Sequence, residues 1–148
     1  MRTSRRAMLA SAPALAVALL RPAGATPETM QDAIRDFLGE AGPVREGRVT
    51  LDIPPLVENG NAVPLTVTVE SPMIAEDHVR SIALFNERNP LPQVLVAQLG
   101  PRAGAARLAT RIRLATSQKV AALAVMSDGS VWSDSADVIV TLAACVEG

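Results

Sequence analysis

Residues 49–69 read VTLDIPPLVENGNAVPLTVTV, and this stretch decides the fold class. Apolar and polar side chains alternate over residues 49–53 and again over residues 65–69, on either side of a turn-like Glu-Asn-Gly-Asn at 58–61. A period of two is typical of a strand with one buried face, and Asn and Gly favour the turn between such strands. The stretch therefore predicts two half-buried strands.

Short apolar runs separated by turn residues continue toward the C-terminus. We expect strands over residues 79–85, 93–99, 106–114, 119–126, 131–133 and 137–142. The expected breaks between them lie at residues 89–90, 100–104, 116–118, 127–130 and 135–136. About eight strands, with no second helix long enough for a parallel crossover, predict an all-β protein, an immunoglobulin-like antiparallel β-sandwich.

One short helix is expected before the strands, over residues 26–39. Thr26 can cap its first turn, Pro27 suits the first helical position, and Gly39 can end it. The apolar stripe of this helix consists of Met30, Ile34, Phe37 and Leu38. We expect the stripe to pack on a sheet or on a partner.

Residues 1–25 look like a twin-arginine signal peptide. The pair Arg5-Arg6 precedes an uncharged run over residues 7–20, and Ala23-Gly24-Ala25 is a small-x-small cleavage site. A membrane anchor is the alternative, but the uncharged run has 14 residues, and about 20 are needed to span a bilayer. We expect cleavage, export in the folded state to the periplasm, and no membrane insertion of the mature protein.

The composition of the mature chain excludes several classes of ligand. After removal of residues 1–25 the chain has 10 basic and 15 acidic residues, 10 minus 15, a net charge of −5. Its aromatic residues are Trp132, Phe37 and Phe85, without any Tyr. An acidic chain without an aromatic platform is a poor candidate for binding nucleic acid or carbohydrate.

Cys145 is the only cysteine and the most informative single residue. Exported proteins use cysteines mostly in pairs, so a lone one indicates a reactive thiol or an intermolecular disulfide. An inert thiol near the chain end is the third reading. No base is expected beside this thiol, and a single histidine, His78, cannot build a blue-copper site. We therefore expect no metal, no cofactor and no catalysis by this chain alone, and we place His78 in a solvated loop.

A few other residues have a structural and a functional reading. Arg107, Arg111 and Arg113 would share one strand face, which is either solvated or docks an acidic partner. Residues 71–73, Ser-Pro-Met, are expected to form a turn, and Trp132 is expected in the core.

Three features together resemble the SoxY family of sulfur-oxidation carriers. They are GRVTLDIPPLVENGNAVPLTVTVESPM at 47–73, TRIRLATSQKVAALAVMSDGSVW at 110–132, and the cysteine near the C-terminus. The resemblance implies an immunoglobulin-like sandwich over residues 26–142 that forms a heterodimer with a second small sandwich, SoxZ. It also implies a mobile C-terminal arm, residues 143–148, whose cysteine carries sulfur intermediates between periplasmic sulfur-metabolism enzymes. That cysteine maps onto Cys145.

The arm departs from the GGCGG pattern usual in that family. It reads Ala143-Ala144-Cys145-Val146-Glu147-Gly148, which is similar to a SoxY-related branch with an AACIE arm. Alanine and valine restrict the backbone more than glycine does, so we expect an arm specialised for fewer partners. The resemblance carries over the thiol and leaves the cargo open, thiosulfate-derived or related. The alternative is a noncovalent assembly module, or a subunit joined to its partner through a disulfide.

Overall fold

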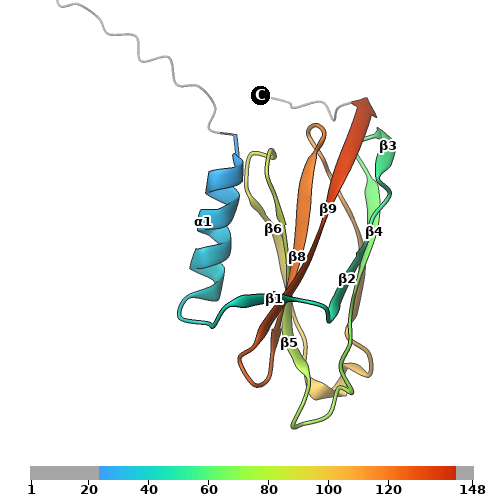
Figure 1. The fold of residues 1–148 in the computed structure, drawn as a ribbon. Coiled ribbons are helices and arrows are strands. Elements are labelled where there is room, and N and C mark those ends of the chain that lie inside the picture. The colour runs from blue at the N-terminus through green and yellow to red at the C-terminus, as the bar shows by residue number, and fades with distance from the viewer. Residues whose placement is uncertain (1–23, 143–148) are drawn as a thin grey trace, which may run out of the picture.

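A computed structural model describes residues 24–142 (Figure 1). The predicted arm, residues 143–148, lies outside these residues. The predicted signal peptide, residues 1–25, also lies outside them except for Gly24 and Ala25. The described elements are α1 (Pro27–Leu38), β1 (Val44–Glu46), β2 (Val49–Asp52), β3 (Leu56–Asn59), β4 (Val63–Val69), β5 (Val79–Asn86), β6 (Gln93–Gln98), the 3₁₀ turn η1 (Pro101–Ala103), β7 (Arg107–Ile112), β8 (Gln118–Met126) and β9 (Val131–Leu142).

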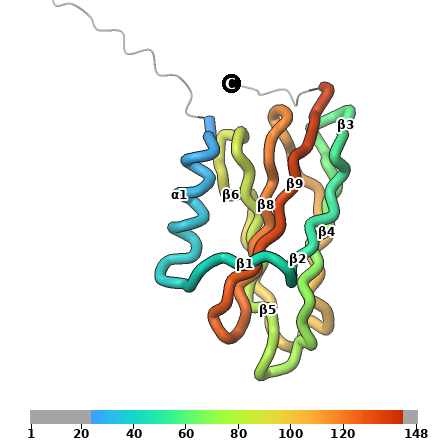
Figure 2. Tube along the Cα trace, viewed as in Figure 1, coloured from blue at the N-terminus to red at the C-terminus, as the bar shows by residue number. Residues whose placement is uncertain are grey.

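The strands form two sheets, and α1 covers the outer face of the larger one (Figures 1 and 2). The larger sheet has the order β1-β9-β8-β5-β6, with β3 also paired to β9, and the smaller has the order β2-β4-β7. Most neighbours are antiparallel, whereas β1 and β3 run parallel to β9. The predicted all-β immunoglobulin-like sandwich with a short N-terminal helix is confirmed.

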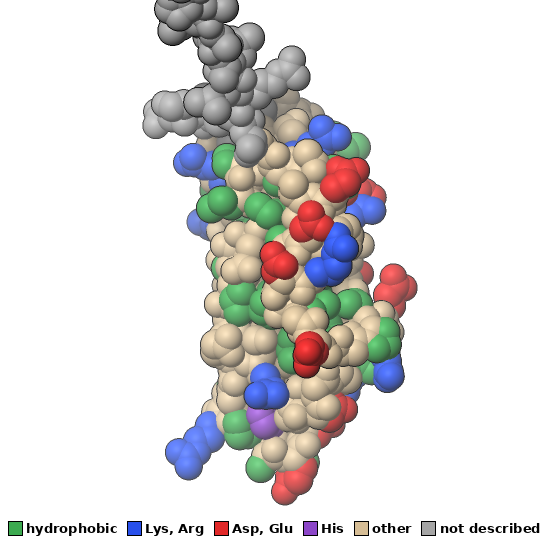
Figure 3. All heavy atoms as spheres, turned by 90° about the vertical axis from the view of Figure 1, so that its left-hand side faces the viewer, with side chains coloured by type: hydrophobic (Ala, Val, Ile, Leu, Met, Phe, Trp, Pro, Cys, Tyr) green, Lys and Arg blue, Asp and Glu red, His purple; other side chains and the backbone are tan. Residues whose placement is uncertain are grey.

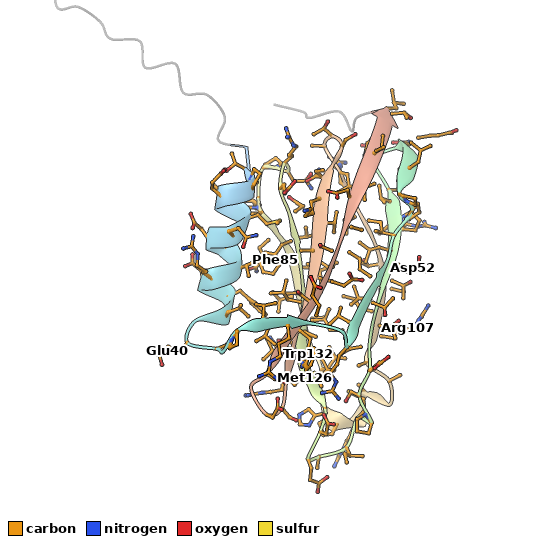
Figure 4. The ribbon with its side chains drawn as sticks, viewed as in Figure 1. Glu40, Asp52, Phe85, Arg107, Met126 and Trp132 are labelled. Atoms are coloured by element: carbon orange, nitrogen blue, oxygen red, sulfur yellow. The ribbon has the colours of Figure 1, made fainter. Side chains whose placement is uncertain are left out.

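The main core lies between the two sheets. Strands β2 and β4 bury every second side chain, the pattern that the sequence predicted for a half-buried strand. Strands β5 and β8 are instead buried almost throughout, because their second face is covered by α1. Met30 and Ile34 of the helix pack there on Phe85 and Leu123. Figure 4 shows Phe85 between the helix and the sheet.

The helix begins and ends at the predicted residues. The Thr26 hydroxyl accepts a hydrogen bond from the Thr29 amide at 3.2 Å, and the Thr29 side chain bonds back to the Thr26 amide. The pKa of Glu28, in this first turn, is lowered by hydrogen bonds to its carboxylate from the Glu28 backbone amide and from the Thr26 side chain. At the other end Gly39 adopts φ 56°, and its amide bonds to the Arg35 carbonyl at 2.9 Å.

The predicted break at residues 135–136 is wrong, because β9 is one strand of 12 residues. Ser135 and Ala136 are small residues that resemble a turn, but they pair in register with Ala121 and Val120 of β8. Pairing along β8 therefore overrides the local turn preference.

Two short strands, β1 and β3, are missing from the sequence prediction. They lie along the edge of β9 that β8 leaves free, β1 at its start and β3 at its end. Between them the chain crosses to the smaller sheet as β2, where the Leu51 amide donates to an Asp134 carboxylate oxygen at 2.8 Å. Neither short strand shows an alternating pattern, so nothing local marked them.

Replacing Phe85 tests the packing of α1 on the sheet. Phe85 is fully buried, and its ring meets that of Phe37 edge-on with centroids 5.7 Å apart. We expect Phe85→Ala to lower the free energy of unfolding by about 3–5 kcal/mol, because it leaves a cavity beneath the helix. Urea denaturation measures the change. Leu91→Ala is the control, since Leu91 is 73% exposed, and a change within about 0.5 kcal/mol is expected there.

Candidate functional site

The C-terminal end of β9 is the last described part of the chain before the predicted arm, residues 143–148. Leu142 is the last described residue and is paired in register with Asn59 of β3 (Figure 1). The β7–β8 loop also lies at this end of the sandwich, since Gln118 pairs with Val138. Cys145 and its neighbours Ala143, Ala144, Val146, Glu147 and Gly148 lie outside the described residues, so their roles stay predictions.

Hydrogen bonds from two sides hold the last residues of β9 in place. The Val140 amide donates to the Ser117 hydroxyl at 2.8 Å, and that hydroxyl lies 3.4 Å from the Val140 carbonyl oxygen. On the other side, the Gly60 amide donates to the Leu142 carbonyl at 3.2 Å. The Thr141 hydroxyl donates to the Glu58 carbonyl at 3.4 Å. The strand is therefore anchored up to Leu142.

A half-buried network of side-chain amides supports this end of the sandwich. The Asn89 side-chain oxygen accepts from the Gln118 amide group at 2.9 Å and from the Ala115 backbone amide at 3.0 Å. The Asn89 amide group donates to the Arg113 carbonyl at 2.6 Å. Together these bonds tie the β5–β6 loop to the β7–β8 loop. From the sequence only turns were expected here. Hydrogen bonds between the side-chain amides of two separate loops leave no pattern in either segment.

Exposed apolar side chains gather on β3 and β9 at the same end. Leu56, Ile139 and Leu142 are 59%, 58% and 66% exposed, and they are three of the six exposed large hydrophobic side chains in the described part of the chain. Leu56 and Ile139 are partners in the parallel register of β3 and β9. Their neighbours Val57 and Val140 turn inward and pack against the core. The sequence analysis missed this patch.

The arginines of β7 and of the position just after it are all exposed, as expected for residues that share one strand face. Arg107, Arg111 and Arg113 are all exposed, and within residues 24–142 none of them has a carboxylate at ion-pair distance. Arg111 also lines an open groove of about 460 Å³ on the outer face of the smaller sheet, together with Asp52. On the helical side of the molecule, which faces the viewer in Figure 3, acidic and basic side chains are interspersed.

Trp132 lies toward the end of the sandwich remote from Leu142, and it is half-buried rather than part of the closed core. It packs against the main core at the point where β9 pairs with β1 (Figure 4). The guanidinium carbons of Arg45 and Arg48 lie 5.8 and 5.7 Å from its ring centroid. Hydrogen bonds from the Ser130 side chain and backbone lower the pKa of Asp128 in the nearby β8–β9 turn.

His78 lies in the loop before β5 at the same remote end. It is half-buried, and its Nδ1 is 3.1 Å from the Ile74 carbonyl oxygen. In the segment 71–73 of this loop, Met73 adopts φ 52° and is buried. Over residues 24–142 no group of three or more His, Cys, Asp or Glu side chains is placed to hold a metal ion. No helix over the same residues has the length and apolar character needed to cross a bilayer.

Fold and site together define a small two-sheet sandwich whose firmly anchored final strand leads to a single thiol. The family model described as sulfur oxidation protein SoxY matches residues 34–145, a region that ends at Cys145, and the chain belongs to this family. The solved sulfur carrier protein SoxY from Chlorobium limicola f thiosulfatophilum is similar, with a TM-score of 0.65 and 25% identity over 78% of this chain and 98% of that one. Family and structure support a carrier role in sulfur oxidation.

Other solved structures share the fold alone. A putative superoxide reductase from Thermotoga maritima has a TM-score of 0.56 and 21% identity over 70% of this chain and 96% of that one. The superoxide reductase, or neelaredoxin, of Ignicoccus hospitalis has a TM-score of 0.57 and 17% identity over 64% of this chain and 80% of that one. A comparison with curated protein sequences found no match.

Removing the Ser117 hydroxyl tests how the base of the arm is held. We expect Ser117→Ala to destabilise the chain by about 1 kcal/mol, because the half-buried Val140 amide loses its acceptor. Hydrogen–deuterium exchange should show faster exchange at Val140 and at the neighbouring residues of β9. Ser135→Ala, an exposed serine on the same strand, is the control. Unchanged exchange at Val140 would contradict the proposed anchoring.

Proposed function

We propose that this protein carries a sulfur-containing group covalently on Cys145 and presents it to partner enzymes of sulfur metabolism in the periplasm. The observation that supports this most directly is the family match, which runs to Cys145 itself. The chain's only thiol thus lies at the position that the resemblance assigns to the carrier cysteine. The anchored end of β9 supplies a defined starting point for the arm.

The length of the arm suits a carrier. Three peptide units join Leu142 to Cys145, and at about 3.6 Å each they allow at most about 11 Å between the two Cα atoms. This distance takes the thiol beyond the end of the sandwich and into an enzyme channel, while the folded domain stays outside. A thiol buried in the sandwich would not be accessible to a second protein.

Thiol chemistry suits the proposed cargo. A thiolate forms and breaks sulfur–sulfur bonds by exchange, so a group attached in this way survives transport and is released by the next enzyme. Catalysis then belongs to the partner enzymes, which supply the acids, bases and redox centres. In this proposal Glu147 is a recognition element, because its carboxylate repels anionic sulfur compounds unless a basic pocket of the partner receives it.

The proposal includes a second subunit and an export route. The resemblance implies a heterodimer with a SoxZ-like sandwich, and the twin-arginine pair Arg5-Arg6 fits export of an assembled, folded complex. The alternative of a noncovalent assembly module needs no adduct on the thiol. Occupancy of Cys145 therefore separates the two functions.

The occupancy of Cys145 is the decisive measurement. Intact mass spectrometry of the protein from its native host, grown with reduced sulfur compounds, should show an added mass on the C-terminal peptide. Reduction should remove it, because the bond is expected to be between two sulfur atoms. Cys145→Ser should show no adduct and should abolish the host's use of that sulfur source. A free thiol under every growth condition would contradict the carrier function.

A matched substitution tests the role of Glu147. Glu147→Gln keeps the size and polarity of the side chain and removes its charge. If a basic pocket receives this carboxylate, the rate of adduct transfer to that partner enzyme should fall about tenfold, corresponding to roughly 1.4 kcal/mol of lost transition-state stabilisation. The measurement is the rate of adduct loss in the presence of the enzyme. Transfer rates that stay unchanged for every partner would exclude the recognition role.

A further inference from the structure

Leu56 and Ile139 form, with the exposed Glu58, Thr141 and Asp137, a surface that we call the arm-side face. We propose that this face is the docking surface for the enzyme that loads or unloads Cys145, and that it receives an apolar patch rimmed by basic side chains. The inference rests on the proposed function and adds to it the site of enzyme contact on the folded domain.

The covalent length of the arm places the enzyme here. The Cys145 Cα lies at most about 11 Å from that of Leu142, and the side chain adds about 3 Å. A reacting group inside an enzyme channel must therefore come within about 14 Å of the end of β9. An enzyme surface around such a channel then meets the residues next to Leu142, because a specific interface covers about 800 Å² of each partner.

The register of β3 and β9 explains why apolar side chains are exposed at this place. Leu56 pairs with Ile139, and the next pair, Val57 with Val140, faces the core. Side chains alternate across a strand, so Leu56 and Ile139 must point outward together. Single exposed apolar residues are ordinary, whereas two that are partners in register form an apolar patch. Leu142 is also exposed, but it alternates with Thr141 and lies at the strand end outside this face.

The surroundings of the patch indicate the charge of its partner. Glu58 and Thr141 occupy the next outward positions after Leu56 and Ile139, and Asp137 precedes Ile139 on the same face. Glu58 and Asp137 are both exposed, and neither has an ion-pair partner within residues 24–142. An apolar centre with an acidic rim fits an enzyme whose channel mouth is apolar and edged with Lys or Arg.

A permanent second subunit is the other possible occupant of this face. A subunit that covered the arm-side face would hide the exposed apolar surface beside the end of β9 and leave the enzyme only the loops at this end of the sandwich. We therefore place the enzyme on this face, and we expect a SoxZ-like subunit to bind elsewhere.

Charge substitution on the arm-side face tests the inference in the native host. The variant is Ile139→Glu, and Leu56→Glu on the facing strand is a second, independent variant. Ile74→Glu is the matched control, because Ile74 is 49% exposed and lies in the loop at the opposite end of the sandwich. Cells receive a pulse of thiosulfate, and intact mass spectrometry follows the gain and loss of the adduct on Cys145.

Two measurements on the purified variants separate docking from folding. Urea unfolding should give the wild-type midpoint, because the replaced side chains are exposed. The rate at which N-ethylmaleimide labels Cys145 should also match wild type, because the small reagent does not dock. If the urea midpoint and the labelling rate are both unchanged, slower turnover of the Cys145 adduct in cells indicates weaker contact with the enzyme.

We expect Ile139→Glu and Leu56→Glu each to slow adduct turnover about tenfold or more, the effect of losing one strong interface residue. Ile74→Glu should stay at the wild-type rate. Wild-type turnover in both arm-side variants would overturn the inference and leave the carrier function intact. Loss of a stable second subunit from these variants would overturn it too, by assigning the face to that subunit. Absence of any adduct in the wild type would refute the carrier function itself.

Discussion

The structure depends on strand β9 being hydrogen-bonded along both edges. Strand β8 pairs with it from Val131 to Val138, while β1 and β3 occupy its other edge at the start and at the end. Between these two short strands the chain crosses to the smaller sheet as β2, where the Leu51 amide bonds to Asp134 of β9. One long strand thus contacts the smaller sheet and also determines where the C-terminal arm begins. A strand bonded on both edges frays less than an edge strand.

This arrangement separates the anchored domain from the segment to which we assign the carrier thiol. Bonds from Ser117 and Gly60 hold β9 up to Leu142, and the amide network of Asn89 and Gln118 stiffens the loops beside it. The thiol proposed to carry the cargo lies three residues further on. In the proposed function the short arm supplies reach, and the surface around its base supplies selectivity.

Features based on local chemistry could be predicted from the sequence, while pairing between distant segments could not. Thr26 and Gly39 delimit the helix through their own side chain or backbone freedom, and the alternation in β2 and β4 reports burial directly. Strand β3 was not predicted, because its pairing joins residues 83 apart, as in the contact of Thr141 with Glu58. The break expected at residues 135–136 was wrong for the same reason. For the site, Cys145 was evident from the sequence as the only thiol, but its position in space lies outside the described residues.

The sequence alone determined the sandwich class, the helix with its caps and the single thiol, because period, turn residues and residue counts can be read from the sequence without knowledge of distant contacts. The tertiary structure alone decided which apolar side chains remain exposed. Leu56 and Ile139 look like ordinary core residues in the sequence, and only the parallel register of β3 with β9 turns both of them outward beside the arm. The physical reason is that a side chain's face on a sheet depends on its partner strand, and here that partner is distant in the chain.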